Sequence, residues 1–483
     1  MDLTAAPAPS TRDLGIVALA LAAALTILAL PAQSAGTLAL VLLGAVVAWF
    51  VPAAMVAVVI VTVPIQDLVV LPFVAGSLTL TQIALFGLAL GWGLGFWRRT
   101  IWLDGIFWWF VAILGALSFS LIAAAEVGPW AEELYRWAAA ALFYLVARSV
   151  LRDGTAIRVA LWGIVVAVCG ASSFGIGQVI ASNGPDHMID GGVLRAFGAF
   201  GTPNPFAAYI EFTVPMLLAI VLVGLHAGHR ATIGRALWAG AAVASALGGV
   251  ILTLTQSRGG WVGFAAAMLV LLWILPWRWR AGAVAAGVVL VGLILLTPPG
   301  QSQLTRFADS LSSDASPLPM LVDVASTGRE AQWGAASAMF VDHPLTGVGA
   351  GQYDYHFRDY TPDWYKRLPL GQAHNGYLHM AAQAGIPGVA TFLGWIIAML
   401  VSLRGALRCA SSPFARGLAL GALACVVAFC VHSVVDYLNV LSLGLQLSAV
   451  VAIGLNAAPG RSTVDEPRLQ QMTTLTPLQA GHA

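Results

Sequence analysis

The sequence predicts an all-α protein, a polytopic bundle of about twelve to fourteen transmembrane helices with one large polar loop. Three observations predict this class. Hydrophobic residues make up 59% of the chain and charged residues only 9%. The mean hydropathy is +0.85. Apolar runs of about 20 residues, the length that crosses the hydrocarbon core of a bilayer, recur along the chain. A soluble globular fold is therefore excluded.

The candidate spans are apolar runs bounded by charged residues, proline or glycine. We count fourteen, at 14–30, 35–50, 52–72, 79–97, 105–124, 131–148, 157–181, 204–225, 235–255, 260–275, 281–297, 377–401, 415–433 and 439–456. They divide the chain into five parts. These are a short N-terminal segment 1–13, a transmembrane region 14–297, a loop 298–376 expected to hold short helices, a second transmembrane region 377–456 and a tail 457–483 with the composition of a disordered segment.

Arginines are distributed unevenly between alternate connections. If the N-terminus is cytoplasmic, one face receives basic pairs such as Arg98 with Arg99 and Arg278 with Arg280, whereas the opposite face receives the loop 298–376. Cytoplasmic connections of membrane proteins carry an excess of Lys and Arg. The pattern therefore predicts that both termini are cytoplasmic and that the loop lies on the outer face.

Charge and cysteine usage exclude several kinds of partner. The net charge of +1 gives no concentrated basic face for a nucleic acid. All four cysteines fall in or beside apolar segments, which favours neither a disulfide framework nor a thiolate metal site. His374 and His379 are five residues apart, so they do not form the i,i+4 pair of a helical zinc site. We predict no metal and no cofactor.

Three arginines on the predicted outer face are candidate anion ligands. Arg258 follows Ser257 at a corner between two apolar runs, and Arg329 opens a helix for which Thr327 and Glu330 have capping-box spacing. A guanidinium is a permanent cation with forked donors suited to a diphosphate. The simpler interpretations are that Arg258 extends to the membrane interface and that Arg329 pairs with an acid of the loop, such as Asp342. Arg195, in a turn-rich entry to a membrane helix, is a further candidate cation.

His374 is the candidate general base, because a group titrating near neutrality stands where the loop re-enters the membrane. Its neighbours Asn375 and Tyr377 are candidate contacts to a glycan or acceptor. Further back, an aromatic-rich segment includes Tyr353 and Trp364 together with several aspartates. Such a surface suits stacking on sugar rings, although a belt of aromatics at the membrane interface would have the same composition.

Taken in order, five motifs resemble the bacterial O-antigen ligase and O-antigen polymerase superfamily: Arg195 to Asn204, Ser257-Arg258-Gly259, Gly328-Arg329, His343 to Gly349, and His374-Asn375. The resemblance implies a membrane glycosyltransferase with a fold like that of the membrane glycosyltransferase C class. Such an enzyme is independent of metal and inverts the configuration at the anomeric carbon. By that resemblance, His374 activates the acceptor, while Arg258 and Arg329 hold the leaving diphosphate. The implied partners are an undecaprenyl-diphosphate-linked glycan donor, a lipid or glycan acceptor and membrane lipid, in the bacterial cytoplasmic membrane.

Several functions remain open within and beyond this resemblance. The acceptor hydroxyl could belong to lipid A core, to a growing lipid-linked polysaccharide or to a protein Ser or Thr. A lipid-linked glycan flippase would also be polytopic and cationic, but transporters place polar groups at mid-membrane and often consist of two related halves. We find no such repeat in the sequence. A non-catalytic scaffold for envelope assembly is the third class, and it would not need His374.

Overall fold

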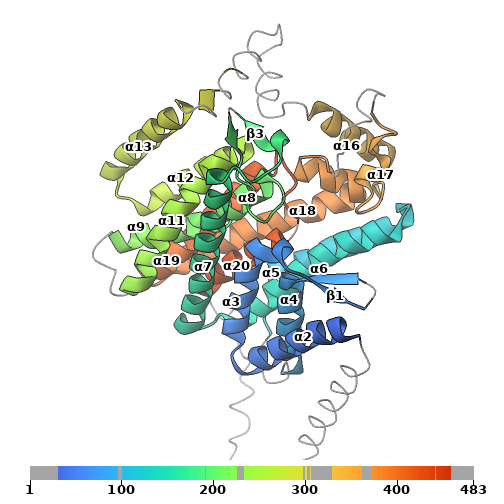
Figure 1. Cartoon of the computed structure of the whole chain (residues 1–483), viewed down its shortest axis with the longest axis horizontal. Helices are drawn as coiled ribbons and strands as arrows, with labels where there is room; N and C mark the ends of the chain where they lie inside the picture. The colour runs from blue at the N-terminus through green and yellow to red at the C-terminus, as the bar shows by residue number, and fades with distance from the viewer. Residues whose placement is uncertain are drawn as a thin grey trace, which may run out of the picture.

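The computed structural model describes residues 31–74, 76–95, 101–190, 192–225, 233–296, 300, 301, 305, 329–361, 372–440 and 442–457. Within these residues the protein is a bundle of helices with two small hairpins, so the predicted all-α membrane class is confirmed (Figure 1). The predicted span 14–30, the segment 1–13, residues 458–483 and Trp364 lie outside the described residues.

The elements follow the sequence in this order. The first part of the chain holds α2 (Ala32–Phe50), α3 (Pro52–Thr62), η1 (Val63–Leu68), β1 (Val70–Phe73), β2 (Gly76–Thr79), α4 (Leu80–Leu94), α5 (Gly105–Phe119), η3 (Ser120–Ala123), α6 (Val127–Val150), α7 (Gly154–Ile180), η4 (Asp186–Met188), β3 (Ile189–Asp190) and β4 (Val193–Leu194). The second part holds α8 (Pro203–Glu211), α9 (Val214–Leu225), α11 (Arg235–Thr255), α12 (Arg258–Leu271), η5 (Leu272–Ile274), α13 (Trp277–Leu295), α16 (Glu330–Asp342), α17 (Tyr353–Phe357), α18 (Gly376–Cys409), α19 (Pro413–His432) and α20 (Leu443–Ala457).

Helices occupy the predicted spans from 35–50 onward. Seven of the helices among the described residues are long and apolar enough to cross a membrane, and four shorter apolar ones accompany them. Two predicted ends are wrong. The span 52–72 ends as a helix at Leu68, because Pro64 removes a helical donor, and the chain then turns into the β1–β2 hairpin. The span 377–401 continues to Cys409.

The interior of the bundle is formed by α20 and by the α8–α9 pair. In Figure 1, α20 is drawn at the centre, and it packs against α6, α18 and α19. The α8–α9 pair is interrupted at Phe212 and Thr213, where Pro215 cannot donate to the preceding turn and the Thr213 hydroxyl donates instead to Tyr209 O at 2.7 Å. This break leaves Glu211 fully buried at the end of α8.

A break in α18 positions the segment that precedes it. The helix loses its regular dihedrals at Ala384 and Gly385, just before Pro387. The turn 343–351 fits against this break: Val348 N donates to Ala382 O at 2.8 Å, and Ile386 N donates to Pro344 O at 2.7 Å. Both Val348 and Ala350 are buried. The turn therefore anchors α16 and α17 on the first half of α18, close to His374, which precedes the helix.

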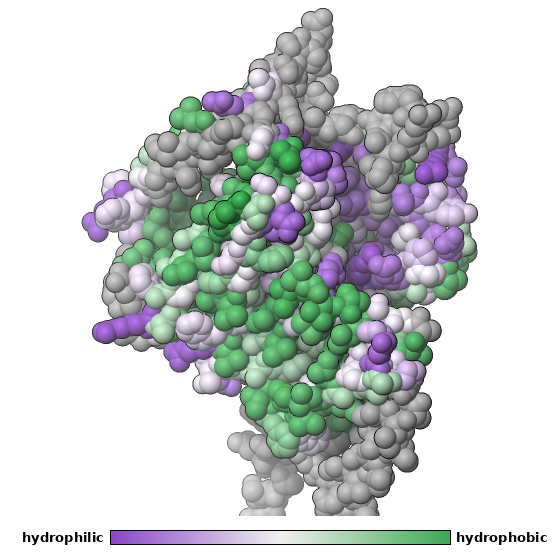
Figure 2. All heavy atoms as spheres, in the orientation of Figure 1, coloured by the Kyte–Doolittle hydropathy of each residue, from purple (hydrophilic) through white to green (hydrophobic). Residues whose placement is uncertain are grey.

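Polar and apolar side chains separate on the surface. Figure 2 shows hydrophobic side chains over much of the visible face of the bundle, whereas hydrophilic side chains gather toward the part formed by α16 and α17. Apolar side chains on a membrane-spanning bundle remain exposed because lipid, unlike water, does not penalise them. The hydrophilic part is the region that the sequence predicted as the outer loop.

The packing of α4 against α2 gives a test of the fold. A Cβ at Gly91 would overlap the carbonyl oxygen of Ala45 and lie 2.7 Å from Ala48 Cβ, whereas a Cβ at Gly93 would meet nothing within 4 Å. We expect Gly91→Ala to destabilise the protein by about 1–3 kcal/mol through overpacking. Gly93→Ala, the matched control on the same helix, should leave stability equal or higher, as measured by thermal unfolding in detergent. Equal melting temperatures for the two variants would contradict the close approach of α2 and α4.

Candidate functional site

His374 precedes α18 and is held at its ring and at its backbone. Its Nδ1 lies 2.9 Å from Oδ1 of Asp436, in the connection between α19 and α20. Its carbonyl accepts a hydrogen bond from Nε1 of Trp333 on α16 at 3.2 Å. Its φ of +47° lies in the left-handed region, which a residue with a Cβ adopts only under external constraint. The imidazole is therefore held in place by two elements distant in sequence.

Asp436 is the acid on which this arrangement centres. It is 2% exposed, and its carboxylate also accepts from the Asn204 amide at 2.7 Å, from the Gln372 amide at 3.4 Å and from its neighbour Tyr437 N at 2.9 Å. Burial alone would raise the pKa of the Asp436 carboxyl, but the hydrogen bond and charge of His374, with further positive groups nearby, hold that pKa well below its usual range. The carboxylate is thus ionised, and Nδ1 of His374 is the donor in their hydrogen bond.

Arg329 reaches the same connection from α16. Its Nη1 donates to Val435 O, and its Nη2 lies 3.9 Å from Oδ2 of Asp436. The predicted helix through Trp333 is confirmed, but its N-cap lies two residues later than predicted. Arg329 itself is the N-cap residue, in place of Thr327. The acid beside Arg329 is Asp436, in the connection between α19 and α20. It is not an acid of the loop 298–376, such as Asp342, which the sequence suggested.

Arg258 and Arg195 lie together at the corner between α11 and α12. Gln256 has a left-handed φ of +53°, and Ser257 caps α12 by accepting from Gly260 N at 3.3 Å, so Arg258 is the first residue of that helix. Nε of Arg195 donates to Thr255 O at 3.0 Å. Both arginines were predicted to lie on the outer face. In the structure Arg258 begins α12 and Arg195 contacts Thr255, so both belong to the corner between α11 and α12.

The corner packs onto the connection that holds His374 and Arg329. A Cβ at Gly259 would lie 2.8 Å from Val435 Cγ2 and 2.6 Å from the ring of His432. Only a glycine allows α12 to approach so closely, and this brings the start of α12 against Val435, whose carbonyl Arg329 contacts. Arg329 and the corner that carries Arg258 and Arg195 therefore lie against one short segment, in which Asp436 holds His374.

The other predicted contact residues have structural partners. Oδ1 of Asn375 caps α18 by accepting from Tyr377 N and Leu378 N, both at 3.0 Å. The Tyr377 hydroxyl donates to Cys430 O at 2.9 Å. Tyr353 is 1% exposed, and its hydroxyl donates to Gln332 O at 2.7 Å. These contacts fix the surroundings of His374, and Trp364 lies outside the described residues.

Sequence reasoning missed the acids that surround the site. Asp436 stood in a short polar corner between two apolar runs, and only that isolation could have marked it. Glu211 and His432, from α8 and α19, form a fully buried pair at 2.8 Å, and no spacing in the sequence connects them. On α6, Arg136 pairs with both Glu132 and Glu133, at 2.5 and 2.7 Å.

A family model described as O-antigen ligase matches residues 240–393 of this chain. The matched segment runs from α11 into α18, so it contains Arg258, Arg329 and His374. Over this segment the chain is similar to the O-antigen ligase family. The resemblance that the sequence motifs indicated is thereby confirmed, and an O-antigen ligase or polymerase type of function, glycosyltransferase-like and directed at lipid-linked glycans, is supported. Curated proteins give no match to this chain.

The low pKa of Asp436 predicts a pH-dependent contribution to stability. A carboxyl whose pKa is depressed by folding stabilises the protein fully above its unfolded pKa of about 3.9, and the stabilisation is lost as the pH falls further. We expect Asp436→Asn to cost about 1–3 kcal/mol near pH 7. The difference from wild type should shrink below about pH 4.

Thermal unfolding in detergent across this pH range measures the effect. Asp354→Asn, at an exposed position on α17, is the control and should follow wild type at every pH. A stability difference for Asp436→Asn that stays constant down to pH 3 would show that the carboxylate charge does not stabilise the fold.

Proposed function

We propose that this membrane protein transfers an oligo- or polysaccharide from undecaprenyl diphosphate to an acceptor hydroxyl at the outer face of the bacterial cytoplasmic membrane. The observation that carries the proposal is the ionised, buried Asp436 that holds Nδ1 of His374 while Arg329 lies beside the same carboxylate. The arginine-rich connections of the opposite face support cytoplasmic termini.

The acceptor is activated by His374 in this proposal. With Nδ1 donating to Asp436, the lone pair of the ring is on Nε2, and the His374 side chain is 24% exposed. Nε2 can therefore take the proton of an acceptor hydroxyl, and Asp436 stabilises the imidazolium that forms. The new bond joins the acceptor oxygen to the anomeric carbon, with inversion, because the oxygen attacks opposite the leaving group.

The leaving group is stabilised by the arginines. As the bond between the anomeric carbon and the diphosphate breaks, its electron pair remains on the phosphate oxygen and negative charge develops there. Fixed cations in a partly dry site stabilise such charge without a metal ion. Arg329 contacts the 433–437 segment, and Arg258 and Arg195 belong to the corner that packs against it, so these are the cations we assign to the diphosphate.

Substitution of His374 separates a transferase from a transporter or a scaffold. His374→Asn is the sharpest variant, because asparagine tolerates the left-handed backbone and can still donate to Asp436, yet it cannot act as a base. We expect it to lower carrier release by about 10²–10⁴-fold. The purified protein is incubated with an undecaprenyl-diphosphate oligosaccharide and each candidate acceptor in EDTA. His343→Ala, at an exposed helix end, should retain activity.

Two outcomes would count against the mechanism. Undiminished carrier release by a well-folded His374→Asn variant would remove the general base. If the wild type were active only when a divalent metal ion replaces EDTA, the arginines alone would not be sufficient to stabilise the leaving diphosphate.

The arginines are tested through the donor. Arg258→Lys and Arg329→Lys keep the charge but lose the forked donors, so each should lower kcat/KM for the donor by roughly 10- to 100-fold, the equivalent of one charged hydrogen bond. The acceptor KM should change little. Arg358→Lys, exposed just after α17, is the control. If both lysine variants match the control, the diphosphate is bound elsewhere.

A further inference from the structure

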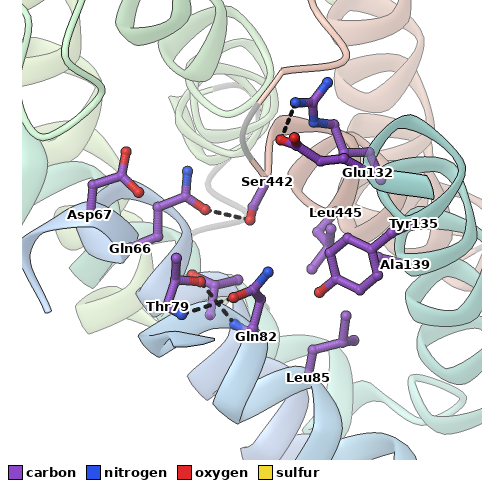
Figure 3. Close-up of a pocket in the computed structure, with 12 residues that line it drawn as sticks. Gln66, Asp67, Thr79, Gln82, Leu85, Glu132, Tyr135, Ala139, Ser442 and Leu445 are labelled. Carbon is purple, nitrogen blue, oxygen red and sulfur yellow. Dashed lines mark hydrogen bonds and ion pairs between the residues drawn. The ribbon is translucent and has the colours of Figure 1, made fainter. Parts of the chain in front are cut away.

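A polar cavity lies next to α6, the helix that Tyr437 of the α19–α20 connection contacts. Its volume is about 220 Å³. Its walls come from η1, the end of β2 that leads into α4, the first turns of α4, the first half of α6 and the residues that begin α20 (Figure 3). None of these elements carries a residue of the predicted site. The described function therefore leaves this cavity unexplained.

The lining combines the groups that recognise a sugar. Amides and hydroxyls come from Gln66, Gln82 and Ser442, and Figure 3 shows these side chains around the same space as the ring of Tyr135. An apolar floor is supplied by Leu85 together with Leu445 and Ala139. A sugar ring has an apolar face and a hydroxyl edge, so it matches an aromatic ring opposed by polar groups.

One buried polar group in the wall lacks a partner. Thr81 is 1% exposed, and among the described residues its hydroxyl finds no hydrogen-bond partner. A buried hydroxyl without a partner costs free energy that a ligand can recover by bonding to it. The neighbouring polar groups are arranged differently: Gln82 accepts from Thr79 N at 2.8 Å, and Gln66 accepts from Ser442. Thr81 is therefore the group in this wall whose bonding a ligand would complete.

The charges of the cavity select against a phosphate. Asp67 and Glu132 line it, and among the described lining residues the one basic group is Arg136, whose guanidinium is already held by Glu132 and Glu133. Two carboxylates would repel a diphosphate. The volume is below the range of about 300–1,000 Å³ usual for drug-sized ligands. These features indicate one small, uncharged, hydroxyl-rich unit.

The cavity is connected to the candidate base by hydrogen bonds. Arg136 bonds Glu133, the Tyr437 hydroxyl donates to Glu133, and Tyr437 N donates to Asp436 at 2.9 Å. Asp436 in turn holds His374. A ligand in the cavity would thus be linked to His374 through Arg136, Glu133, Tyr437 and Asp436, and Tyr437 extends toward α6, whereas Val435 meets the start of α12.

We propose that this cavity binds one neutral sugar unit of the acceptor, so that the acceptor is a glycan and not a protein Ser or Thr. The inference rests on the proposed transfer reaction to identify the bound sugar as part of the acceptor. Sugar binding itself can be measured without transfer. It assigns Thr81, Tyr135 and Gln82 to acceptor recognition, whereas the arginines recognise the donor.

Binding is tested with lipid-free probes and full-length protein in detergent. Tryptophan fluorescence is titrated with a lipopolysaccharide core oligosaccharide, with a repeat-unit oligosaccharide and with a Ser/Thr peptide. We expect at least one oligosaccharide to bind and the peptide not to bind. Thr81→Val should weaken sugar binding about 3- to 10-fold, the effect of one neutral hydrogen bond. Ala139→Leu, which fills the cavity, should weaken it further. Thr155→Val, an exposed threonine at the start of α7, is the matched control.

The outcomes distinguish this inference from the proposed function. His374→Asn should bind the oligosaccharide as wild type does, although it transfers nothing. In the transfer assay, Thr81→Val should raise the acceptor KM by the same factor and leave the donor KM unchanged. Failure of both oligosaccharides to bind wild type, or unchanged binding in both Thr81→Val and Ala139→Leu, would overturn the sugar cavity and leave the transferase intact. An active His374→Asn variant would overturn the assignment of His374 as the general base and leave the cavity intact.

Discussion

The candidate site depends on a single buried carboxylate. Asp436 accepts hydrogen bonds from His374 and Asn204 and lies beside Arg329, so three segments far apart in the sequence meet at one residue. An ionised group 2% exposed would be costly by itself, since desolvation penalises its charge. The surrounding donors offset that cost, and for this reason their positions are coupled. Removal of the acid would release the imidazole and leave the arginine without its counter-ion.

The packing of the surrounding helices fixes the position of this mostly buried connection. It joins α19 and α20, two of the most buried helices, so its ends are fixed by packing. The glycine at 259 admits the start of α12, and the break in α18 seats the turn that carries α16. Small residues and helix breaks thus place cations and a base around a segment that has no helical structure of its own.

The proposed donor and acceptor sides follow from the charges on either side of Asp436. Arg195 and Arg258 lie toward α11 and α12, while the Glu132, Glu133 and Tyr437 groups lie toward α6. A diphosphate would be attracted to the first side and repelled from the second. The charge pattern therefore orders the substrates around His374, with the carrier on the cationic side and the sugar hydroxyl on the other.

The sequence by itself determined the membrane class and most of the helix positions, because hydrophobic length is a local property that each segment carries alone. It also singled out Arg258, Arg329 and His374, since a cation or an imidazole at the end of an apolar run is rare enough to be noticed. Only the tertiary structure decided that Asp436 holds the base, that Glu211 pairs with His432 and that a polar cavity adjoins the site. Each of these joins residues separated by many helices, and the register between packed helices is set by side-chain volumes throughout the bundle, which no local pattern records.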